Sequence, residues 1–205
     1  MKDLERALAD ITAIRSQMAR GTAFRGYGPM TIAATGLLTI VAGGAQAVWL
    51  PEPTADIAAY LILWVAVAAL AAILIGVEMV ARTRRIHSGL ADEMLHAAVE
   101  QFMPAAVAGA LLTVVLVRSA PQSVWMLPGL WQIIFGLGVF ASGRALPRPI
   151  FAAGVWYLAA GLANLASANG DNALSPWAMA VPFGFGQLYI AVVLYRSVGA
   201  HDDEA

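Results

Sequence analysis

The sequence has no cysteine and very little charge. Without cysteine there can be no disulfide, no thiolate-ligated metal site and no thiol nucleophile. Charged residues make up 12% of the chain and apolar residues 60%, whereas soluble domains have about 25% and about 45–50%. So little charge cannot cover the surface of a soluble protein, and the composition therefore favours a membrane protein. The net charge of −1 supplies no basic field, so we expect no nucleic-acid partner.

The few charges are clustered, and they leave six uncharged intervals long enough to cross a bilayer. These intervals hold 17 to 26 residues each, and a membrane-spanning helix needs about 20. Transmembrane β-strands would be about half as long and would alternate in polarity. The pattern therefore predicts an all-α polytopic protein with six transmembrane helices. The predicted helices are Pro29–Leu50, Ile57–Val80, Phe102–Val117, Val124–Ser142, Pro149–Ala168 and Pro176–Tyr195.

The distribution of basic residues predicts how these helices are oriented. With a cytoplasmic N-terminus, every basic residue among the 12 except Arg118 lies on the cytoplasmic side. The positive-inside rule favours that arrangement. Trp49, Trp125 and Trp177 then lie at outer helix ends, where an interfacial aromatic belt is expected. We therefore expect a multi-pass protein of the bacterial inner membrane, surrounded by membrane lipids, with both termini in the cytoplasm.

The short connections predict that consecutive helices pair as three antiparallel hairpins. Each helix that starts on the cytoplasmic side has a proline that we expect near its first turn, where the missing N–H costs nothing. These helix starts have similar sequences. Three parallel repeats of a two-helix hairpin would explain the similarity, and so would the fact that all membrane helices draw on the same few residue types. The similar starts are Gly28–Val41, Met103–Val115 and Arg148–Gly161, and Gly-x-x-Gln recurs at Gly129–Gln132 and Gly184–Gln187.

The chain is predicted to have three parts: a cytoplasmic amphipathic helix over 1–25, a transmembrane domain over 26–197, and an acidic cytoplasmic tail over 198–205. The longest cytoplasmic connection covers 81–100. The N-terminal helix could lie in the headgroup layer, pack on a partner, or cover its own bundle. Its apolar residues recur at spacings of three and four and form one stripe: Leu4, Leu8, Ile11, Ile14 and Met18.

Six polar side chains are predicted within the spans, where an amide or hydroxyl needs a partner. They could line a polar cavity or pathway. They could instead bond helices to one another, each bond contributing about 0.6–2 kcal/mol, and this second interpretation is favoured. Four lie near mid-depth, Gln132, Gln187, Thr39 and Thr113, and two lie nearer the outside, Asn164 and Gln46.

Five ionisable residues are the remaining candidates for chemistry. Glu78 lies near the end of a predicted span, and Arg82 follows one turn later in the favourable order for a helical ion pair. An interfacial ion pair is favoured over a proton or cation site. Glu93, His96 and Glu100 share the connection, and Glu93-x-x-His96 resembles half of a di-iron carboxylate motif. The second half is missing, so a solvated face is favoured over a metal site, and no cofactor is expected.

Three stretches resemble a family of six-span bacterial membrane proteins whose activity is uncharacterised. The first is ITAIRSQMARGTAF (Ile11–Phe24). The second is MLPGLWQIIFGLGVFASGRAL (Met126–Leu146), continued by RPIFAAGVWYLAAGLAN (Arg148–Asn164), and the third is WAMAVPFGFGQLYIAVVLYR (Trp177–Arg196). The resemblance implies the six-span topology and transfers no functional residue. Members of the family often accompany small winged-helix regulators, which implies a role in a sensing or stress circuit.

These observations favour a non-enzymatic membrane module that binds a partner or senses the membrane. We expect it to be a homo-oligomer that presents residues 1–25 and 81–100 to a cytoplasmic partner protein. A small transporter or channel with a polar path at mid-membrane is the alternative. A lipid enzyme is the third hypothesis. It lacks a visible catalytic set, because all three histidines (His87, His96 and His201) lie outside the predicted spans.

Overall fold

The computed structural model describes residues 28–86, 89–142, 148–168, 172 and 174–202. Side chains are described for these residues except 82–86, 89–98 and 198–202. In this part of the chain the predicted all-α architecture is confirmed, because 6 helical segments are long and apolar enough to cross a membrane. The helices are α2 (Pro29–Trp49), α3 (Ile57–Ile86), α4 (Gly89–Ser119), α5 (Leu127–Ala141), α6 (Phe151–Ser167) and α7 (Pro176–Asp202), with 3-10 turns η1 (Pro121–Met126) and η3 (Arg148–Ile150) before α5 and α6.

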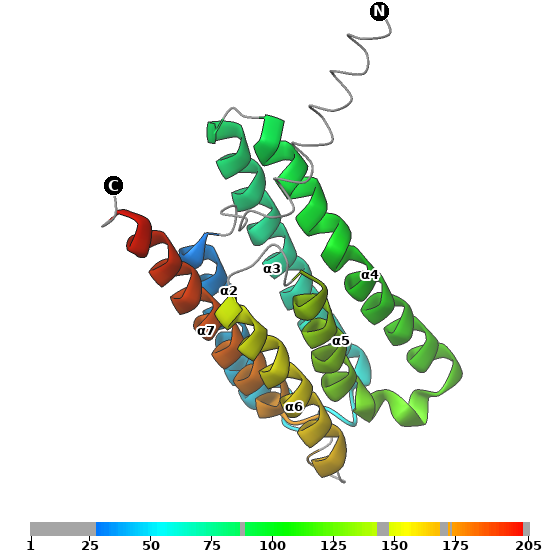
Figure 1. Cartoon of the computed structure of the whole chain (residues 1–205). Coiled ribbons are helices and arrows are strands. Elements are labelled where there is room, and N and C mark those ends of the chain that lie inside the picture. The colour runs from blue at the N-terminus through cyan, green and yellow to red at the C-terminus, as the bar shows by residue number, and fades with distance from the viewer. Residues whose placement is uncertain (1–27, 87–88, 143–147, 169–171, 173, 203–205) are drawn as a thin grey trace, which may run out of the picture.

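Helices α3 and α4 are longer than predicted, each on the side of the connection between them. The apolar span of α3 ends at Ala81, but the helix continues to Ile86. The span of α4 begins at Val99, but the helix begins at Gly89. The connection predicted over 81–100 is therefore mostly a helical hairpin that extends past the other helices (Figure 1). Charge ends the apolar span, but the alanines, leucines and glutamates of this stretch favour helix and continue it.

The early start of α4 makes one prediction wrong. Pro104 lies inside the helix instead of near its first turn. A proline within a helix removes one backbone hydrogen bond, so its place must be tolerated by neighbouring contacts. The prolines of the other two similar starts fit the prediction: Pro29 begins α2, and Pro149 lies in η3 just before α6. At the other end of the chain, α7 continues to Asp202 and includes the start of the predicted tail.

The two tightest helix pairs are α2 with α7 and α5 with α6, and Figure 1 shows each pair side by side. In the α5–α6 pair, glycines make the close approach possible. A Cβ on Gly129 would lie 2.6 Å from the Gly161 carbonyl oxygen, and a Cβ on Gly161 would lie 2.6 Å from the Gly129 carbonyl oxygen. One heptad along, Gly136 faces the Gly154 carbonyl oxygen in the same way, at 3.0 Å. Seven-residue spacing keeps these glycines on one helix face, and only glycine lets the two backbones approach so closely.

The α2–α7 pair is built on the same principle. A Cβ on Gly36 would lie 3.0 Å from Cβ of Gln187 and 3.1 Å from the Gly184 carbonyl oxygen. A Cβ on Gly43 would collide with Ala180. The first and last of the six spans, which are far apart in the sequence, are therefore in close contact.

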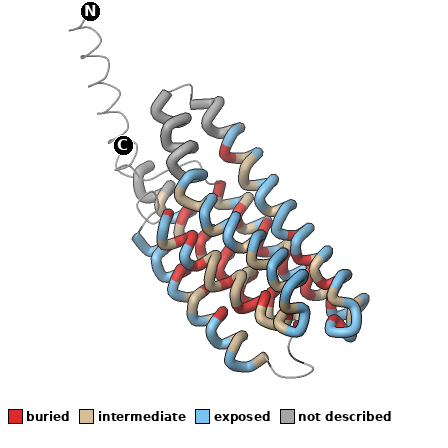
Figure 2. The backbone as a smooth tube through the Cα atoms, turned by 90° about the vertical axis from the view of Figure 1, so that its right-hand side faces the viewer, coloured by how far each residue is buried: buried red, intermediate tan, exposed pale blue. Residues whose placement is uncertain are grey.

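Helices α3 and α4 lie at the periphery of these two pairs. The α3 span is 17% buried and the α4 span 6%, compared with 50% for the α7 span, and Figure 2 shows the buried positions gathered in the middle of the bundle. The two helices of each predicted hairpin, α2 with α3, α4 with α5 and α6 with α7, are in contact, but neither of the two tightest pairs is a predicted hairpin. Helices α3 and α4, which belong to different predicted hairpins, contact each other only sparsely. Tyr60 and Trp64 attach α3 to the core. Phe102 of α4 packs beside Gly138 of α5.

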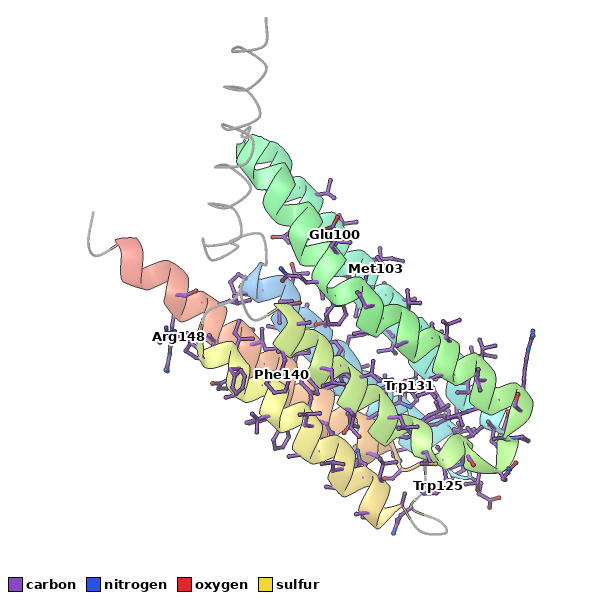
Figure 3. The ribbon with its side chains drawn as sticks, turned by 45° about the vertical axis from the view of Figure 1, so that its right-hand side comes forward. Glu100, Met103, Trp125, Trp131, Phe140 and Arg148 are labelled. Carbon is purple, nitrogen blue, oxygen red and sulfur yellow. The ribbon has the colours of Figure 1, made fainter. Side chains whose placement is uncertain are left out.

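The apolar core is divided between the two ends of the bundle. We call the end of the bundle at which α2 begins and α7 ends the inner end, because it is predicted to face the cytoplasm. The opposite end is called the outer end. Glu100 and Arg148 lie toward the inner end and Trp125 toward the outer end (Figure 3). The inner-end cluster is Ile32, Val139, Ile150, Ala153, Tyr157, Ile190, Ala191 and Leu194, and the outer-end cluster is Ala42, Tyr60, Trp64, Val67, Leu174, Met179 and Ala180.

The glycine contacts predict that a single methyl group at the α5–α6 contact will destabilise the protein. Gly129→Ala should lower the free energy of unfolding by about 1–3 kcal/mol, because the two backbones must separate. Gly76→Ala on α3 is the matched control, since a Cβ there meets nothing within 4 Å. The control should be neutral or stabilise by up to about 1 kcal/mol. Unfolding of both purified variants in detergent measures the difference, and equal effects would contradict this account of the contact.

The predicted orientation can be tested directly, because the chain has no cysteine to remove. Single cysteines can be introduced at Glu52, in the sequence between α2 and α3, and at Ser88, in the sequence between α3 and α4. One predicted membrane span separates the two positions, so the predicted topology puts them on opposite sides of the membrane. On intact cells, a membrane-impermeant maleimide should label Glu52→Cys at once and Ser88→Cys only after permeabilisation. The opposite pattern would show that the orientation is wrong.

Candidate functional site

The most heavily bonded polar site in the described residues surrounds a backbone carbonyl group that a proline leaves free. In a regular helix the carbonyl oxygen of Ala178 would accept from the backbone N–H of residue 182. Pro182 has no N–H, and it lies inside α7. Hydrocarbon offers no replacement donor, so the carbonyl needs a partner from the protein itself.

Two side-chain amides supply that partner. Gln132 of α5 donates from Nε2 to the Ala178 carbonyl oxygen at 2.7 Å, and Asn164 of α6 donates from Nδ2 to the same oxygen at 2.9 Å. Asn164 Nδ2 also donates to Gln132 Oε1 at 2.9 Å, so both of its N–H groups are in use. Gln132, Asn164 and the Ala178 carbonyl group, here the amide cluster, therefore link α5, α6 and α7.

A second group of bonds holds the segment just before α7. Gln46 of α2 is 1% exposed. Its Nε2 donates to the Leu174 carbonyl oxygen at 2.8 Å, and its Oε1 accepts from Trp64 Nε1 of α3 at 2.7 Å. On α6, Trp156 Nε1 donates to the Pro182 carbonyl oxygen at 3.0 Å. Three carbonyl groups spaced four residues apart, one just before α7 and two in its outer part, thus accept bonds from side chains of α2, α5 and α6.

The other predicted polar residues lie apart from the amide cluster. Thr39 donates to the Gly36 carbonyl oxygen of its own helix at 2.7 Å. Thr113 donates to the Gly109 carbonyl oxygen at 2.8 Å and accepts from Trp131 Nε1 at 2.9 Å, and Figure 3 shows Trp131 on α5 where it faces α4. Gln187 is buried where α7 packs on α2. The hydrogen bonds described for Gln132, Asn164, Gln46, Thr39 and Thr113 therefore fall in separate groups, and among these five residues only Gln132 and Asn164 bond to each other.

The predicted ionisable candidates are mostly beyond the described side chains. Glu78 is half-buried on α3, near the end of its span. The side chains of Arg82, Glu93 and His96 lie outside the described part, so the ion pair and the weak metal site stay predictions. Glu100 is exposed near the start of the α4 span. Among the described residues, no group of three His, Asp or Glu side chains could hold a metal ion.

Sequence reasoning missed three buried hydroxyl groups that have no hydrogen-bond partner among the described residues. They belong to Tyr60, Tyr157 and Ser142. The Tyr157 ring packs edge-on to Phe135, with ring centroids 4.7 Å apart, and its hydroxyl group lies directly beside Gly186 of α7. A buried hydroxyl group without a partner costs about 1–3 kcal/mol. A tyrosine at mid-span was the available signal, but a tyrosine ring is also an ordinary core residue.

Chemically, the amide cluster binds backbone and does not present a reacting group. Amides do not titrate near neutral pH, and the donors in the cluster are directed at carbonyl oxygens of the protein itself. The arrangement is therefore suited to stabilising a proline break inside the membrane. Comparison with protein-family models, curated proteins and solved structures finds no match to this chain, so the resemblance to a six-span family stays a prediction.

The amide cluster predicts a stability loss that depends on Pro182. Gln132→Leu and Asn164→Leu should each lower the free energy of unfolding by about 0.6–2 kcal/mol. In a Pro182→Ala background each loss should shrink, because the restored backbone N–H serves the Ala178 carbonyl group. Gln187→Leu, at a second buried glutamine outside the cluster, should cost the same in both backgrounds. Unfolding of the single and double variants in mixed micelles gives the free energies of this double-mutant cycle. If the losses at Gln132 or Asn164 simply add to the effect of Pro182→Ala, the proposed bonding is contradicted.

Proposed function

We propose that this integral membrane protein is a non-enzymatic module that binds a cytoplasmic partner protein. The observation that carries the proposal is the helical extension of α3 and α4 beyond their membrane spans. Helix α3 continues from Ala81 to Ile86, and α4 starts ten residues before Val99, at Gly89. A helical hairpin that stands outside the bilayer offers a preformed helical surface for a partner, whereas a connection without regular structure would first have to be ordered.

The charges of the hairpin support a polar partner surface. Three arginines lie at the end of α3, and acidic residues lie at the start of α4. Complementary charge of this kind increases the rate and specificity of association more than it increases affinity. The charged positions are Arg82, Arg84, Arg85, Asp92 and Glu93.

The bonding of the amides within the spans supports a structural role over a transport path. A transport path would use polar side chains that can exchange partners with a solute, as in the alternative of a small transporter or channel. Gln132, Asn164 and Gln46 instead donate to backbone carbonyl oxygens at 2.7–2.9 Å. These bonds favour a rigid scaffold that positions the hairpin.

The rest of the proposal concerns setting and assembly. The proposed location is the bacterial inner membrane with both termini in the cytoplasm, supported by eleven of 12 basic residues on that side. A homo-oligomer in contact with membrane lipids is also proposed, since many large apolar side chains of α3 and α4 are exposed. The N-terminal residues 1–25 are proposed as a second part of the partner surface.

Native mass spectrometry of the protein, extracted gently from its own membrane, tests the proposal. The wild type should retain a second polypeptide. A variant in which Arg82, Arg84 and Arg85 are changed to Glu should lose it. A matched charge reversal of Asp202, Asp203 and Glu204 to Lys, on the same predicted side, should keep it. A second polypeptide that survives the arginine changes would place the contact elsewhere, and a mass of this chain alone in all samples would contradict partner binding.

A further inference from the structure

Two of the three basic side chains that the structure describes lie at the inner end of the α6–α7 contact. Arg148 is in η3, just before α6, and Arg196 is near the end of α7, whereas Arg118 lies at the outer end of the bundle, near the end of α4. Both inner arginines are exposed, and neither forms an ion pair with a described residue. Figure 3 shows Arg148 projecting away from the bundle. The charge of both side chains is therefore available to an anion at the membrane boundary.

A hydrogen bond places the two arginines on one surface. The Tyr189 hydroxyl group donates to the Pro149 carbonyl oxygen at 3.0 Å, so Arg148, the residue before Pro149, is held beside α7. Arg196 follows Tyr189 by seven residues, which is nearly two helical turns, and it therefore lies on the same face of α7. Two cations from different helices are thus presented on the same side of the molecule.

An apolar strip extends from these charges along the same face of α7. Phe185, Tyr189, Val192 and Arg196 follow one another at spacings of four, three and four residues, which keeps them on one helix face. Phe185 and Val192 are exposed. On α6, Trp156 packs on the Phe185 ring, with ring centroids 4.7 Å apart, and it donates to the Pro182 carbonyl oxygen. We call the surface formed by Arg148, Trp156, Phe185, Tyr189, Val192 and Arg196 the arginine face.

The length of the strip matches one leaflet of a bilayer. From Phe185 to Arg196 the helix rises about 16 Å, and half of the hydrocarbon core is about 15 Å thick. A phospholipid whose phosphate group contacts the arginines can therefore lay an acyl chain along Val192 and Phe185. Exposed apolar side chains surround most of the bundle and by themselves select no ligand. The selective element of the arginine face is the pair of cations at the end of the strip.

No described acidic side chain lies on the arginine face. Glu52 and Asp56 belong to the connection between α2 and α3, and Glu78 and Glu100 belong to α3 and α4. Figure 3 shows Glu100 across the bundle from Arg148. The positive charge of the face is therefore not cancelled by a described neighbour, and basic sites of this kind between membrane helices bind anionic headgroups.

We propose that the arginine face binds an anionic phospholipid, with the phosphate group at Arg148 and Arg196 and one acyl chain along the strip. A guanidinium group suits a phosphate group because it donates two parallel hydrogen bonds to it. A zwitterionic lipid binds less tightly, since its own ammonium group is repelled by the two arginines. The occupant is a lipid and not a free phosphate ester, because the apolar strip continues directly from the charges. This inference does not depend on partner binding by the α3–α4 hairpin.

Native mass spectrometry of the full chain in detergent, titrated with one lipid at a time, tests the proposal. The wild type should bind phosphatidylglycerol about 10- to 30-fold more tightly than phosphatidylcholine with the same acyl chains. Arg148→Gln and Arg196→Gln should each weaken the binding of phosphatidylglycerol about 5-fold, the factor expected for one basic residue near an anionic headgroup. Arg118→Gln removes the same charge at the outer end and is the matched control, which should leave this affinity unchanged.

A competition experiment separates a lipid site from a phosphate site. Glycerol phosphate has a similar charged group without acyl chains, so it should not displace phosphatidylglycerol at equal concentration. Displacement by glycerol phosphate overturns the assignment to a lipid. Equal affinity of the wild type for the two lipids overturns the proposal, and this comparison needs no variant to fold. An equal loss of affinity in Arg118→Gln also overturns it, because general attraction to positive charge would then explain the binding.

Discussion

Every backbone polar group inside the membrane spans must find its partner within the protein, because the surrounding hydrocarbon offers none. That constraint explains why α7 and its neighbours have the polar residues they have. Pro182 breaks one backbone bond, and Gln132 and Asn164 replace it from two other helices. The cost of a proline within a membrane span is thus offset by bonds that also fix how α5, α6 and α7 lie together. A change at any of these three residues alters the bonding available to the other two.

The second organising feature is the difference between the glycine-packed pairs and the periphery. In the pairs α5–α6 and α2–α7, backbone approaches backbone, so even one methyl group is excluded at Gly129 or Gly161. Gly76 on α3 meets nothing within 4 Å, and Gly109 on α4 meets only a methyl group of Ile134 at 3.9 Å. The close-packed helices therefore form a firm centre, while α3 and α4 can accommodate substitutions, lipid or another chain at much smaller cost. The same two helices extend beyond the membrane, so the least constrained part of the bundle is also its most prominent part.

Much of the fold follows from the sequence because charge placement marks membrane boundaries well. It marks helix ends less well, since a helix can leave the membrane without ending, as α3 and α4 do. Gln132 and Asn164 were recognisable as amides within the predicted spans that needed partners. Their shared partner was not, because a backbone carbonyl group carries no sequence signal of its own and depends on which helices are neighbours. Pro182 was the available clue: a proline inside a span implies a free carbonyl group four residues earlier. The Tyr157 hydroxyl group was invisible, because burial without a partner depends on the packing of Phe135 and Gly186.

The contact of α2 with α7 also has a consequence for biosynthesis. A ribosome makes α2 first and α7 last among the six spans, so the glycine face of α2 must remain in the membrane without its final partner until synthesis of α7 is complete. In contrast, α5 and α6 are consecutive and can pair as soon as both have been inserted. Contacts between segments far apart in the sequence, such as the α2–α7 contact, form late and slowly. We therefore expect the α5–α6 pair to form first during assembly and α7 to pack last. When α7 packs, it brings the Ala178 carbonyl group to Gln132 and Asn164, and its small residues to the glycine face of α2.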